Sequence, residues 1–311
     1  MISVLGGGVA GLCAATALSE EGYEVELIVP NNAPAPASYL AGGMLAPFCE
    51  GETAPDCVVA RGQMAIGWWA RRVRSFAARG TLVVARDIDA PELDRVALAT
   101  KENLWISPNE LEPALAGRFP RGLFFPDEAH LDPREALTTL RDGLIARGVR
   151  FREVLQGERV VDCRGISARD KLVDLRAVRG EMLEVMAPDV SLTRPIRLLH
   201  PRFPCYVVPR GNGRYMIGAT MVENGLAGPI TVRATKDLLS AVQTLHPGFA
   251  EAQIINTGAG LRPAFPDNVP VLRREANRIH LNGLYRHGFL MAPALSLEIL
   301  QLLKKEIDDR P

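Results

Sequence analysis

The most chemically informative residues are glycines close to the start of the chain. Gly6, Gly8 and Gly11 fit the pattern G-x-G-x-x-G, with Val9 and Ala10 before the last glycine. The pattern follows a short apolar stretch and opens a helical one, as a dinucleotide-binding loop requires. The first glycine permits a tight turn, the second lets backbone approach a pyrophosphate, and the third lets the helix lie close to the strand. We therefore predict a phosphate-binding helix N-terminus, with a glycine turn that binds no ligand as the alternative.

The residue expected to hold the ribose of a dinucleotide is missing. An Asp or Glu usually stands near the end of the second strand and binds a ribose hydroxyl. Here Val29 is followed by Pro30, Asn31 and Asn32. Asn31 can hydrogen-bond a ribose without carrying charge, so we predict it as the ribose contact. No arginine stands beside it, so a 2′-phosphorylated cofactor is not favoured.

The elements around this loop predict a parallel sheet. Apolar stretches at 2–5 and 25–29 flank a helical pattern at 9–20, which predicts two parallel strands with a crossover helix. A Pro-, Ala- and Gly-rich loop then covers 30–55, which is long enough to indicate a functional loop. Further along we expect helices at 58–78, 133–148 (with Asp132 as N-cap) and 293–307, and a buried strand at 160–163.

The remaining segments predict a second kind of sheet. Residues 81–130 alternate short strands with Pro-containing turns, and 176–256 carry alternating patterns typical of antiparallel strands. The fold class is therefore α/β, a Rossmann-like nucleotide-binding domain with an inserted antiparallel-sheet domain. We predict that the first domain comprises 1–80, 131–175 and 257–311, and the substrate domain 81–130 and 176–256.

Composition excludes several classes of protein. Thirty-six basic residues balance thirty-six acidic ones, so no global field favours nucleic acid or acidic membranes. The sequence has no apolar run long enough for a membrane span, and the N-terminus reads as a buried strand. Five scattered cysteines form no C-x-x-C pair, which favours reduced thiols, the cytoplasm, and neither a metal site nor a dithiol motif.

Three further motifs carry a family resemblance. They are Ser38-Tyr39-Leu40-Ala41-Gly42-Gly43-Met44-Leu45-Ala46-Pro47, Gly260-Leu261-Arg262-Pro263 and Tyr285-Arg286-His287-Gly288. With the glycine loop, in this order, they resemble the D-amino-acid oxidase superfamily, and within it the glycine oxidases of thiamine biosynthesis. The resemblance runs from residue 1 to about 305 and is thinnest in 80–130 and 149–160.

The resemblance implies FAD as the cofactor and assigns roles to individual residues. It implies that Arg262 binds the substrate carboxylate, that Tyr206 and Met221 line the pocket, and that Met44 and Arg286 lie beside substrate and flavin. The other implied cofactor contacts are Ser38, Ala41, Gly42, Gly43, Val154, Cys163, Gly165, His287, Gly288, Phe289 and Leu290.

The chemistry of these side chains agrees with the roles but leaves alternatives open. A carboxylate in a partly dry pocket needs a permanently charged, two-pronged donor, which favours Arg262 over any lysine. A surface or interdomain ion pair is the alternative for Arg262. Tyr206 can orient a polar ligand or be an ordinary core tyrosine, and Met44 and Met221 can be core fillers.

The implied activity is oxidative deamination of glycine or another small amino acid. Hydride passes from the alpha carbon to FAD, giving an imine or glyoxylate, ammonia and, with molecular oxygen, hydrogen peroxide; the imine would serve thiazole formation. Alternatives are an oxidase or dehydrogenase of another small amine, such as sarcosine or a D-amino acid, and a flavin-binding protein without turnover. Only about a dozen residues, 148–160, separate the helix from the next buried strand, where relatives hold a longer segment that touches adenine. A homo-oligomer is compatible with all of these.

Overall fold

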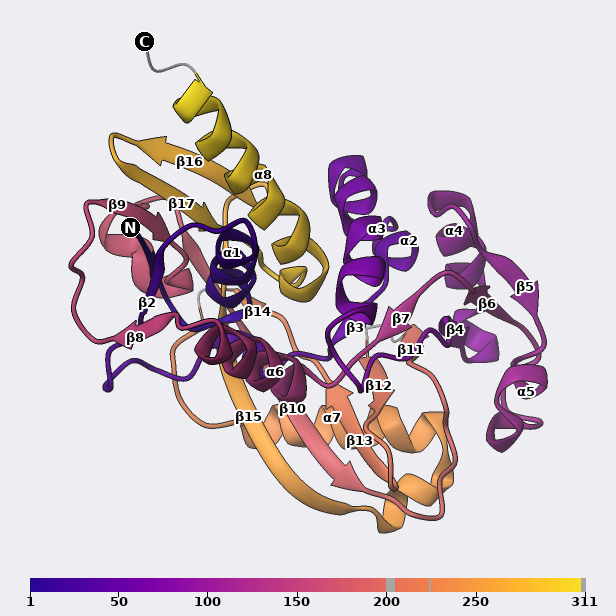
Figure 1. Ribbon diagram of the computed structural model, residues 1–311. Helices are drawn as coiled ribbons and strands as arrows, with labels where there is room; N and C mark the ends of the chain where they lie inside the picture. Colours follow the sequence, from indigo (N-terminus) through magenta and orange to yellow (C-terminus); the bar gives the residue numbers. More distant parts are fainter. Residues whose placement is uncertain (200–204, 224, 309–311) are drawn as a thin grey trace.

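The computed structural model describes residues 1–199, 205–223 and 225–308. Positions 200–204, 224 and 309–311 of the predicted domains lie outside the described residues. Two large sheets organise this part of the chain, and Figure 1 shows them side by side, with the first and last elements packed together on one sheet.

The first sheet contains the N-terminus and has six strands in the order β16-β17-β9-β1-β2-β8. Five of them run parallel and only β16 is antiparallel to its neighbour. Their bounds are β1 Ile2–Leu5, β2 Val25–Ile28, β8 Arg150–Arg152, β9 Arg159–Asp162, β16 Val271–Glu275 and β17 Arg278–Asn282. The parallel core confirms the predicted nucleotide-binding architecture.

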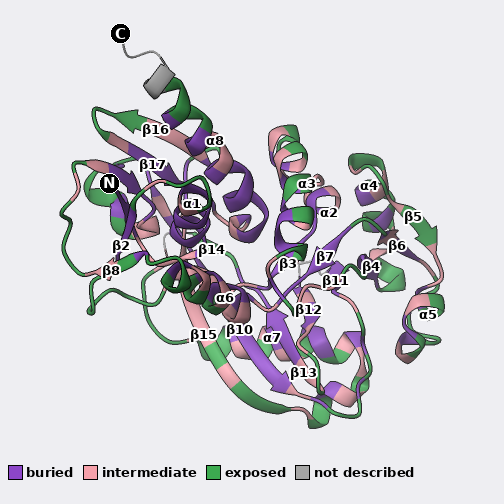
Figure 2. Cartoon of the chain, viewed as in Figure 1, coloured by how far each residue is buried: buried purple, intermediate pink, exposed green. Residues whose placement is uncertain are grey.

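Four helices pack together beside this sheet: α1 Val9–Glu20, α3 Asp56–Ala70, α6 Pro133–Ala146 and α8 Gly288–Asp308. The first is buried at every residue from Val9 to Leu18, and Figure 2 shows it enclosed by its neighbours. As predicted, α6 begins with a capping residue: the Asp132 carboxylate accepts hydrogen bonds from the N–H groups of Arg134 and Glu135.

The last helix begins earlier than the sequence predicts. We expected it to start at Pro293, but α8 starts at Gly288 and Pro293 lies inside it. Proline has no N–H and therefore leaves the carbonyl four residues before it without a helical donor. That carbonyl belongs to Phe289, and Trp69 Nε1 donates to it at 2.8 Å. The indole from α3 thus replaces the missing bond and makes the interior proline tolerable.

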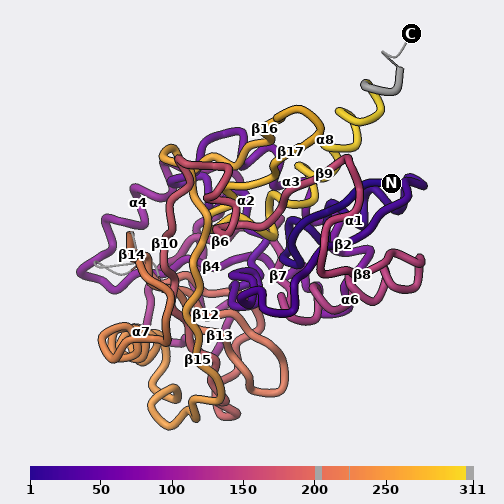
Figure 3. The backbone as a smooth tube through the Cα atoms, turned by 90° about the vertical axis from the view of Figure 1, so that its left-hand side faces the viewer, coloured from indigo at the N-terminus to yellow at the C-terminus, as the bar shows by residue number. Residues whose placement is uncertain are grey.

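The second sheet has nine strands and is largely antiparallel. Its order is β14-β10-β13-β12-β11-β4-β6-β5, with β15 paired to β10 and one parallel pair, β11 with β4. The bounds are β4 Thr81–Ala85, β5 Leu104–Ile106, β6 Gly122–Phe125, β10 Arg176–Met186, β11 Ile196–Leu199, β12 Cys205–Pro209, β13 Arg214–Gly218, β14 Val222–Glu223 and β15 Gln253–Ala264. Figure 3 shows the long strands β10 and β15 running together along this sheet.

Shorter elements connect the two sheets. The two-stranded pair β3 Met44–Leu45 and β7 Ala129–His130 joins segments far apart in sequence, and α2 Pro47–Glu50 follows β3 directly. The other helices are α4 Ala90–Ala99, α5 Pro108–Leu111 and α7 Val232–Leu245, with 3-10 turns η1 Ala37–Leu40, η2 Asp87–Asp89, η3 Pro113–Leu115, η4 Gly165–Asp170 and η5 Pro247–Glu251.

Several predicted boundaries were wrong. The helix expected at 58–78 ends at Ala70, and α4 and α7 lie in segments that we expected to contain strands alone. The predicted loop 30–55 contains η1, β3 and α2, and the short segment 149–160 contains β8. The division into two domains stays a prediction. Strand β15 runs across the boundary predicted at residue 257, because it pairs with β10 on both sides of that boundary, with one register shift between Glu184 and Val185.

Candidate active site

The glycine loop turns from β1 into α1 with almost no space to spare. A Cβ added at Gly11 would stand 1.9 Å from the Gly6 carbonyl oxygen, and Gly6 itself has φ +103°. Alanine therefore fits at neither position. No acidic side chain lies in the first turn of α1, so the positive end of the helix stays available to an anion. The N–H of Val9 donates to Ser38 Oγ at 3.2 Å, which brings the predicted residue Ser38 to this helix end.

Strand β9 places Cys163 and Gly165 next to the same loop. The N–H of Cys163 donates to the Leu5 carbonyl at 2.9 Å, and a Cβ added at Gly6 would stand 2.6 Å from the Cys163 carbonyl oxygen. Burial raises the pKa of the Cys163 thiol well above its usual value, so it contributes packing, not a thiolate. Gly165 has φ +59° and its carbonyl accepts the Asn282 amide.

The buried side chain of Arg210 fixes the segment Ala41–Gly43 through hydrogen bonds to its backbone. Arg210 Nη2 donates to the carbonyls of Ala41 and Gly42, and its Nη1 donates to the Leu131 carbonyl at 3.0 Å. Burial lowers the pKa of Arg210 to about 10, and Asp132 partly offsets this, so the side chain stays charged at neutral pH. The guanidinium thus holds the predicted flavin-lining segment in one conformation.

Tyr206 contacts that segment directly. A Cβ added at Gly42 would stand 2.7 Å from its ring carbon Cε2, and a Cβ at Gly218 would stand 2.9 Å from its hydroxyl oxygen. The ring therefore lies between Gly42, which comes just before β3, and Gly218, the last residue of β13. Burial raises the pKa of Tyr206, while Arg262 and Arg286 act against the increase. The hydroxyl is consequently protonated and able to donate at physiological pH.

Arg262 lies on β15 with its guanidinium over Gly180 of β10. A Cβ at Gly180 would stand 2.1 Å from Arg262 Nη2, so this close stacking requires glycine. Arg262 Nη1 donates to the Thr220 carbonyl at 3.1 Å. Burial lowers its pKa, while the nearby Tyr206 raises it and Arg286 lowers it further. Arg262, Tyr206 and Arg286 therefore lie within electrostatic reach of one another, and we take the space beside them as the predicted substrate pocket.

Met221 and Arg286 meet at the rim of this pocket. Tyr285 Oη lies 3.3 Å from Met221 Sδ, and Arg286 Nη1 lies 3.9 Å from the same sulfur. Tyr285 is tied to the Arg262 strand, since its N–H donates to the Pro263 carbonyl at 2.8 Å. Met221 is 39% exposed, so it is not a core filler, and its place beside the substrate stays a prediction. Met44, on β3, packs against the small core around β4 and β6.

An acidic residue that sequence reasoning missed pairs with Arg286. Arg286 Nη2 lies 2.8 Å from Glu50 Oε1, and His287 Nδ1 lies 3.6 Å from Glu50 Oε2. Burial alone would raise the pKa of Glu50, but Arg286 and its neighbours outweigh burial and bring it to about 2. Burial lowers the pKa of His287 to about 4 despite Glu50, so this imidazole is neutral.

Gly288, Phe289 and Leu290, at the start of α8, were predicted to contact the cofactor. The side chains of Phe289 and Leu290 point into the core: Phe289 packs 5.4 Å from Trp69, and Leu290 fills the space over Gly62. Any cofactor contact from these two residues must therefore come from their backbone N–H groups, which belong to the unpaired first turn of the helix. Gly288 opens that turn.

Asn31 and Val154 lie together at the far end of the glycine loop. Asn31 Nδ2 donates to Glu153 Oε1 at 2.5 Å, and Val154, next to Glu153, is 71% exposed. Both residues follow the carboxyl ends of parallel strands, the edge where such sheets bind nucleotides. Their contact with adenosine stays a prediction.

Sequence reasoning gave no role to Arg210, Tyr285 and Thr220. Tyr285 carries a positive φ of +48°, which sequence does not reveal, and the Thr220 contact uses only its carbonyl. Glu50 stood in the predicted functional loop, three residues after Pro47, the last position of the quoted motif. Its burial beside Arg286 and Arg197 was the missing information.

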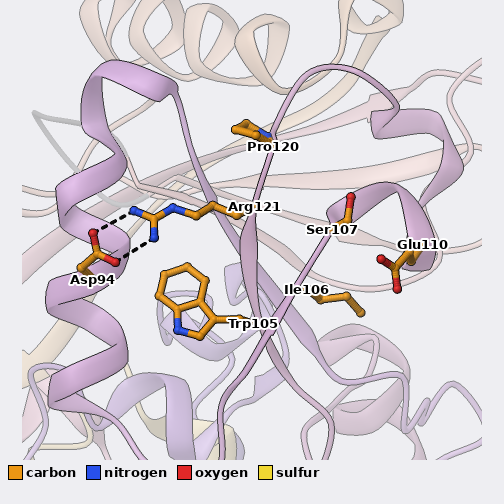
Figure 4. A pocket seen from close by; sticks show the side chains of 7 residues that line it. All are labelled: Asp94, Trp105, Ile106, Ser107, Glu110, Pro120 and Arg121. Carbon is orange, nitrogen blue, oxygen red and sulfur yellow. Dashed lines mark hydrogen bonds and ion pairs between the residues drawn. The ribbon is translucent and has the colours of Figure 1, made fainter.

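A separate surface hollow lies between α4, β5 and α5. It has a volume of about 560 Å³ and is lined by Asp94, Trp105, Ile106, Ser107, Glu110, Pro120 and Arg121. Figure 4 shows the Arg121 guanidinium bound by both Asp94 carboxylate oxygens beside the Trp105 ring. None of the predicted site residues lines this hollow.

Two absences apply to the described residues alone. Residues 1–199, 205–223 and 225–308 contain no group of three or more His, Cys, Asp or Glu side chains arranged to hold a metal ion. Within the same ranges, no helix is both long enough and apolar enough to cross a membrane.

Comparison with known proteins identifies the family of this site. Residues 1–302 match the family of FAD dependent oxidoreductases called DAO. The chain belongs to this family. The sequence is 48% identical, over 98% of this chain and 97% of the relative, to a Rhizobium etli protein named "Putative thiamine biosynthesis oxidoreductase ThiO". The structure resembles glycine oxidase from Geobacillus kaustophilus with a TM-score of 0.85 at 20% identity, over 98% of this chain and 94% of that one. It resembles iminodiacetate oxidase from Chelativorans sp. BNC1 with a TM-score of 0.84 at 21% identity, covering 98% and 95%.

Membership of the DAO family makes FAD the cofactor, and the glycine loop fits it. The loop has no room for a side chain at Gly6 or at Gly11. The N-terminal end of α1 presents backbone N–H groups, and its first turn contains no acidic residue. A pyrophosphate needs this combination of close backbone and partial positive charge. The α/β fold and the oxidoreductase class predicted from the sequence are thus confirmed.

Proposed function

We propose that the chain oxidises a small amino acid, glycine foremost, giving an imine or glyoxylate, ammonia and hydrogen peroxide. The observation that carries the proposal is the position of Arg262. Its guanidinium stacks on Gly180, beside a tyrosine that touches the Ala41–Gly43 segment. A buried guanidinium next to the predicted flavin wall is suited to anchor a carboxylate with the alpha carbon facing the cofactor.

Bound FAD supplies the electron sink that accepts hydride from the alpha carbon. The protein residues position the substrate. Arg262 binds its carboxylate, and the Tyr206 hydroxyl donates a second hydrogen bond to it. Arg210 keeps the Ala41 and Gly42 carbonyls in place, so that the predicted flavin-lining segment Ala41–Gly43 does not move during the reaction.

The charge of the pocket favours an amino acid whose amine is neutral. Arg262 and Arg286 are cationic, Glu50 is ionised and His287 is neutral, so these four side chains carry a single net positive charge. An amino acid with a free amine is a monoanion and matches that charge. Hydride departure requires the nitrogen lone pair, so the form that binds best is also the reactive one.

The walls of the pocket favour a small side chain. The Tyr206 ring lies against both Gly42 and Gly218, where even a methyl group on either glycine would collide with it. Met221, tied to Tyr285 and Arg286, borders the other side. The ThiO relative supports a role in thiamine biosynthesis, where the imine would be consumed in thiazole formation.

A substrate panel with peroxide detection tests this proposal. Purified enzyme loaded with FAD would be assayed with glycine, sarcosine, D-alanine and iminodiacetate. We expect peroxide with glycine and the highest kcat/KM for it or for sarcosine. Reduction of an artificial dye without peroxide would make the chain a dehydrogenase. Failure of every amine to reduce the flavin would remove the proposal and favour a flavin-binding protein without turnover.

A further inference from the structure

The end of β2 lacks the acid that usually binds the adenosine ribose of a dinucleotide. The strand leads into Pro30 and Asn31, and Asn31 alone presents one acceptor oxygen. A ribose diol presents two hydroxyl donors, which is why a carboxylate is common there. FAD as the cofactor, shown by the family, therefore leaves one hydroxyl partner to be found.

The strand beside β2 carries a carboxylate to the same place. Strand register aligns Leu5 of β1 with Ile28 of β2, and Ile28 with Arg152 of β8. The pairing continues one step further, because the N–H of Val29 donates to the Arg152 carbonyl at 2.8 Å. Glu153 is the next residue, so it leaves the sheet at the edge where the glycine loop and Asn31 also emerge.

The two side chains are already joined. Asn31 Nδ2 donates to Glu153 Oε1 at 2.5 Å, and both residues are exposed. The amide uses one of its two N–H donors in this bond and leaves Asn31 Oδ1 as an acceptor, while the second oxygen of Glu153 remains beside it. Together they offer two acceptors, one of them charged, as a single ribose-binding carboxylate does.

We propose that Glu153, from β8, with Asn31, from β2, binds the adenosine ribose hydroxyls of FAD. The carboxylate comes from the neighbouring strand instead of β2. A negative charge at this position also repels a 2′-phosphate, which keeps the site selective for an unphosphorylated ribose. The inference rests on FAD as the cofactor and is independent of the amino acid substrate.

The test measures binding, not turnover. Apoprotein is titrated with FAD and with the FAD analogue that contains 2′-deoxyadenosine, and dissociation constants are read from flavin fluorescence. We expect Glu153→Ala to weaken FAD binding about 10-fold, as expected for loss of a hydrogen bond to a charged group. Glu153→Gln, which keeps one acceptor oxygen, should lose less. Wild-type protein should prefer FAD over the deoxy analogue, and Glu153→Ala should lose most of that preference.

A matched variant separates this effect from a general change of charge. Glu158 lies in the same segment, but it precedes β9 and so stands at the opposite, amino edge of the sheet. Glu158→Gln should bind both ligands as wild type does. Circular dichroism and the melting temperature of each apoprotein confirm that the variants are folded. An unchanged preference for FAD over its deoxy analogue in Glu153→Ala, or an equal loss in Glu158→Gln, would overturn the proposal.

Discussion

Arg286 and Glu50 form an ion pair at the edge of the pocket, with Arg286 Nη2 2.8 Å from Glu50 Oε1. The pair joins α2, which follows the Met44 segment, to the turn that opens α8. Its consequence is electrostatic: Glu50 already neutralises Arg286, so in the proposed pocket Arg262 is the arginine left to bind a carboxylate. The arrangement thus matches a substrate with one carboxylate instead of two.

Substituting Glu50 should change the preference among amine substrates. Glu50→Gln leaves Arg286 without its anionic partner, so a substrate with a second carboxylate gains a binding group. We expect kcat/KM for iminodiacetate, relative to glycine, to rise about 10-fold, the magnitude of one charge-assisted hydrogen bond. Glu110→Gln, in the separate surface hollow, is the control. An unchanged ratio in Glu50→Gln would show that the pair does not determine substrate charge.

Removing the Arg262 guanidinium should weaken substrate binding. Arg262→Ala is expected to raise the KM for glycine 10-fold or more, because a hydrogen bond to a charged group contributes roughly 1.5–3 kcal/mol. Arg262→Lys should recover only part, since a lysine presents no fork to the carboxylate. Arg233→Ala, an exposed arginine at the start of α7, is the control. A wild-type KM in Arg262→Ala would place the carboxylate elsewhere.

The stacking of Arg262 on Gly180 makes a further prediction. Gly180→Ala would place a methyl 2.1 Å from Arg262 Nη2, so the guanidinium must shift. We expect a raised KM with the melting temperature little changed, because the colliding atom is at the far end of a flexible side chain that can change rotamer. The control is Gly143→Ala on α6, where the new methyl meets only Arg147 Nη1 at 3.2 Å. Wild-type KM values in both variants would contradict the stacked geometry.

Glu128 should make stability fall as pH rises. Burial raises its pKa to about 8, and the N–H of Cys49, which donates to Glu128 Oε1 at 2.7 Å, offsets this in part. Between the unfolded pKa near 4.3 and about pH 8, the folded state therefore holds a proton that the unfolded state has lost. The free energy of unfolding should decrease across this window, by at most about 1.4 kcal/mol per pH unit for one group.

Glu128→Gln tests this dependence. The amide keeps an acceptor oxygen for Cys49 but does not titrate, so its stability relative to wild type should increase from pH 5 to pH 8. Denaturant unfolding at several pH values measures the difference. Parallel curves for variant and wild type would mean that Glu128 does not carry a raised pKa.

The sequence was most informative where function depends on local geometry. The Gly6–Gly11 turn, the strands on either side of α1 and the Asp132 cap are set by neighbours a few residues away, so their patterns predict them directly. Arg262 and Arg286 could be singled out only because their motifs resemble a known family, and their roles stay predictions.

Other features depend on contacts between distant segments. Trp69 allows α8 to include Pro293, and this bond spans 220 residues. Arg210 reaches the Gly42 carbonyl across 168 residues, and Glu153 reaches Asn31 across 122. No local pattern indicates such pairs, which is why the start of α8, the support of the Ala41–Gly43 segment and the carboxylate near the ribose edge came from the structure.

The most direct test of the account is the absorption spectrum of the FAD-loaded protein before and after glycine is added without oxygen. We predict that the flavin band bleaches in the wild-type protein, and that Arg262→Ala requires at least 10-fold more glycine for the same bleaching. A flavin band that stays unchanged in the wild-type protein at every glycine concentration, with sarcosine and D-alanine equally without effect, would contradict the central claim that this pocket oxidises small amino acids.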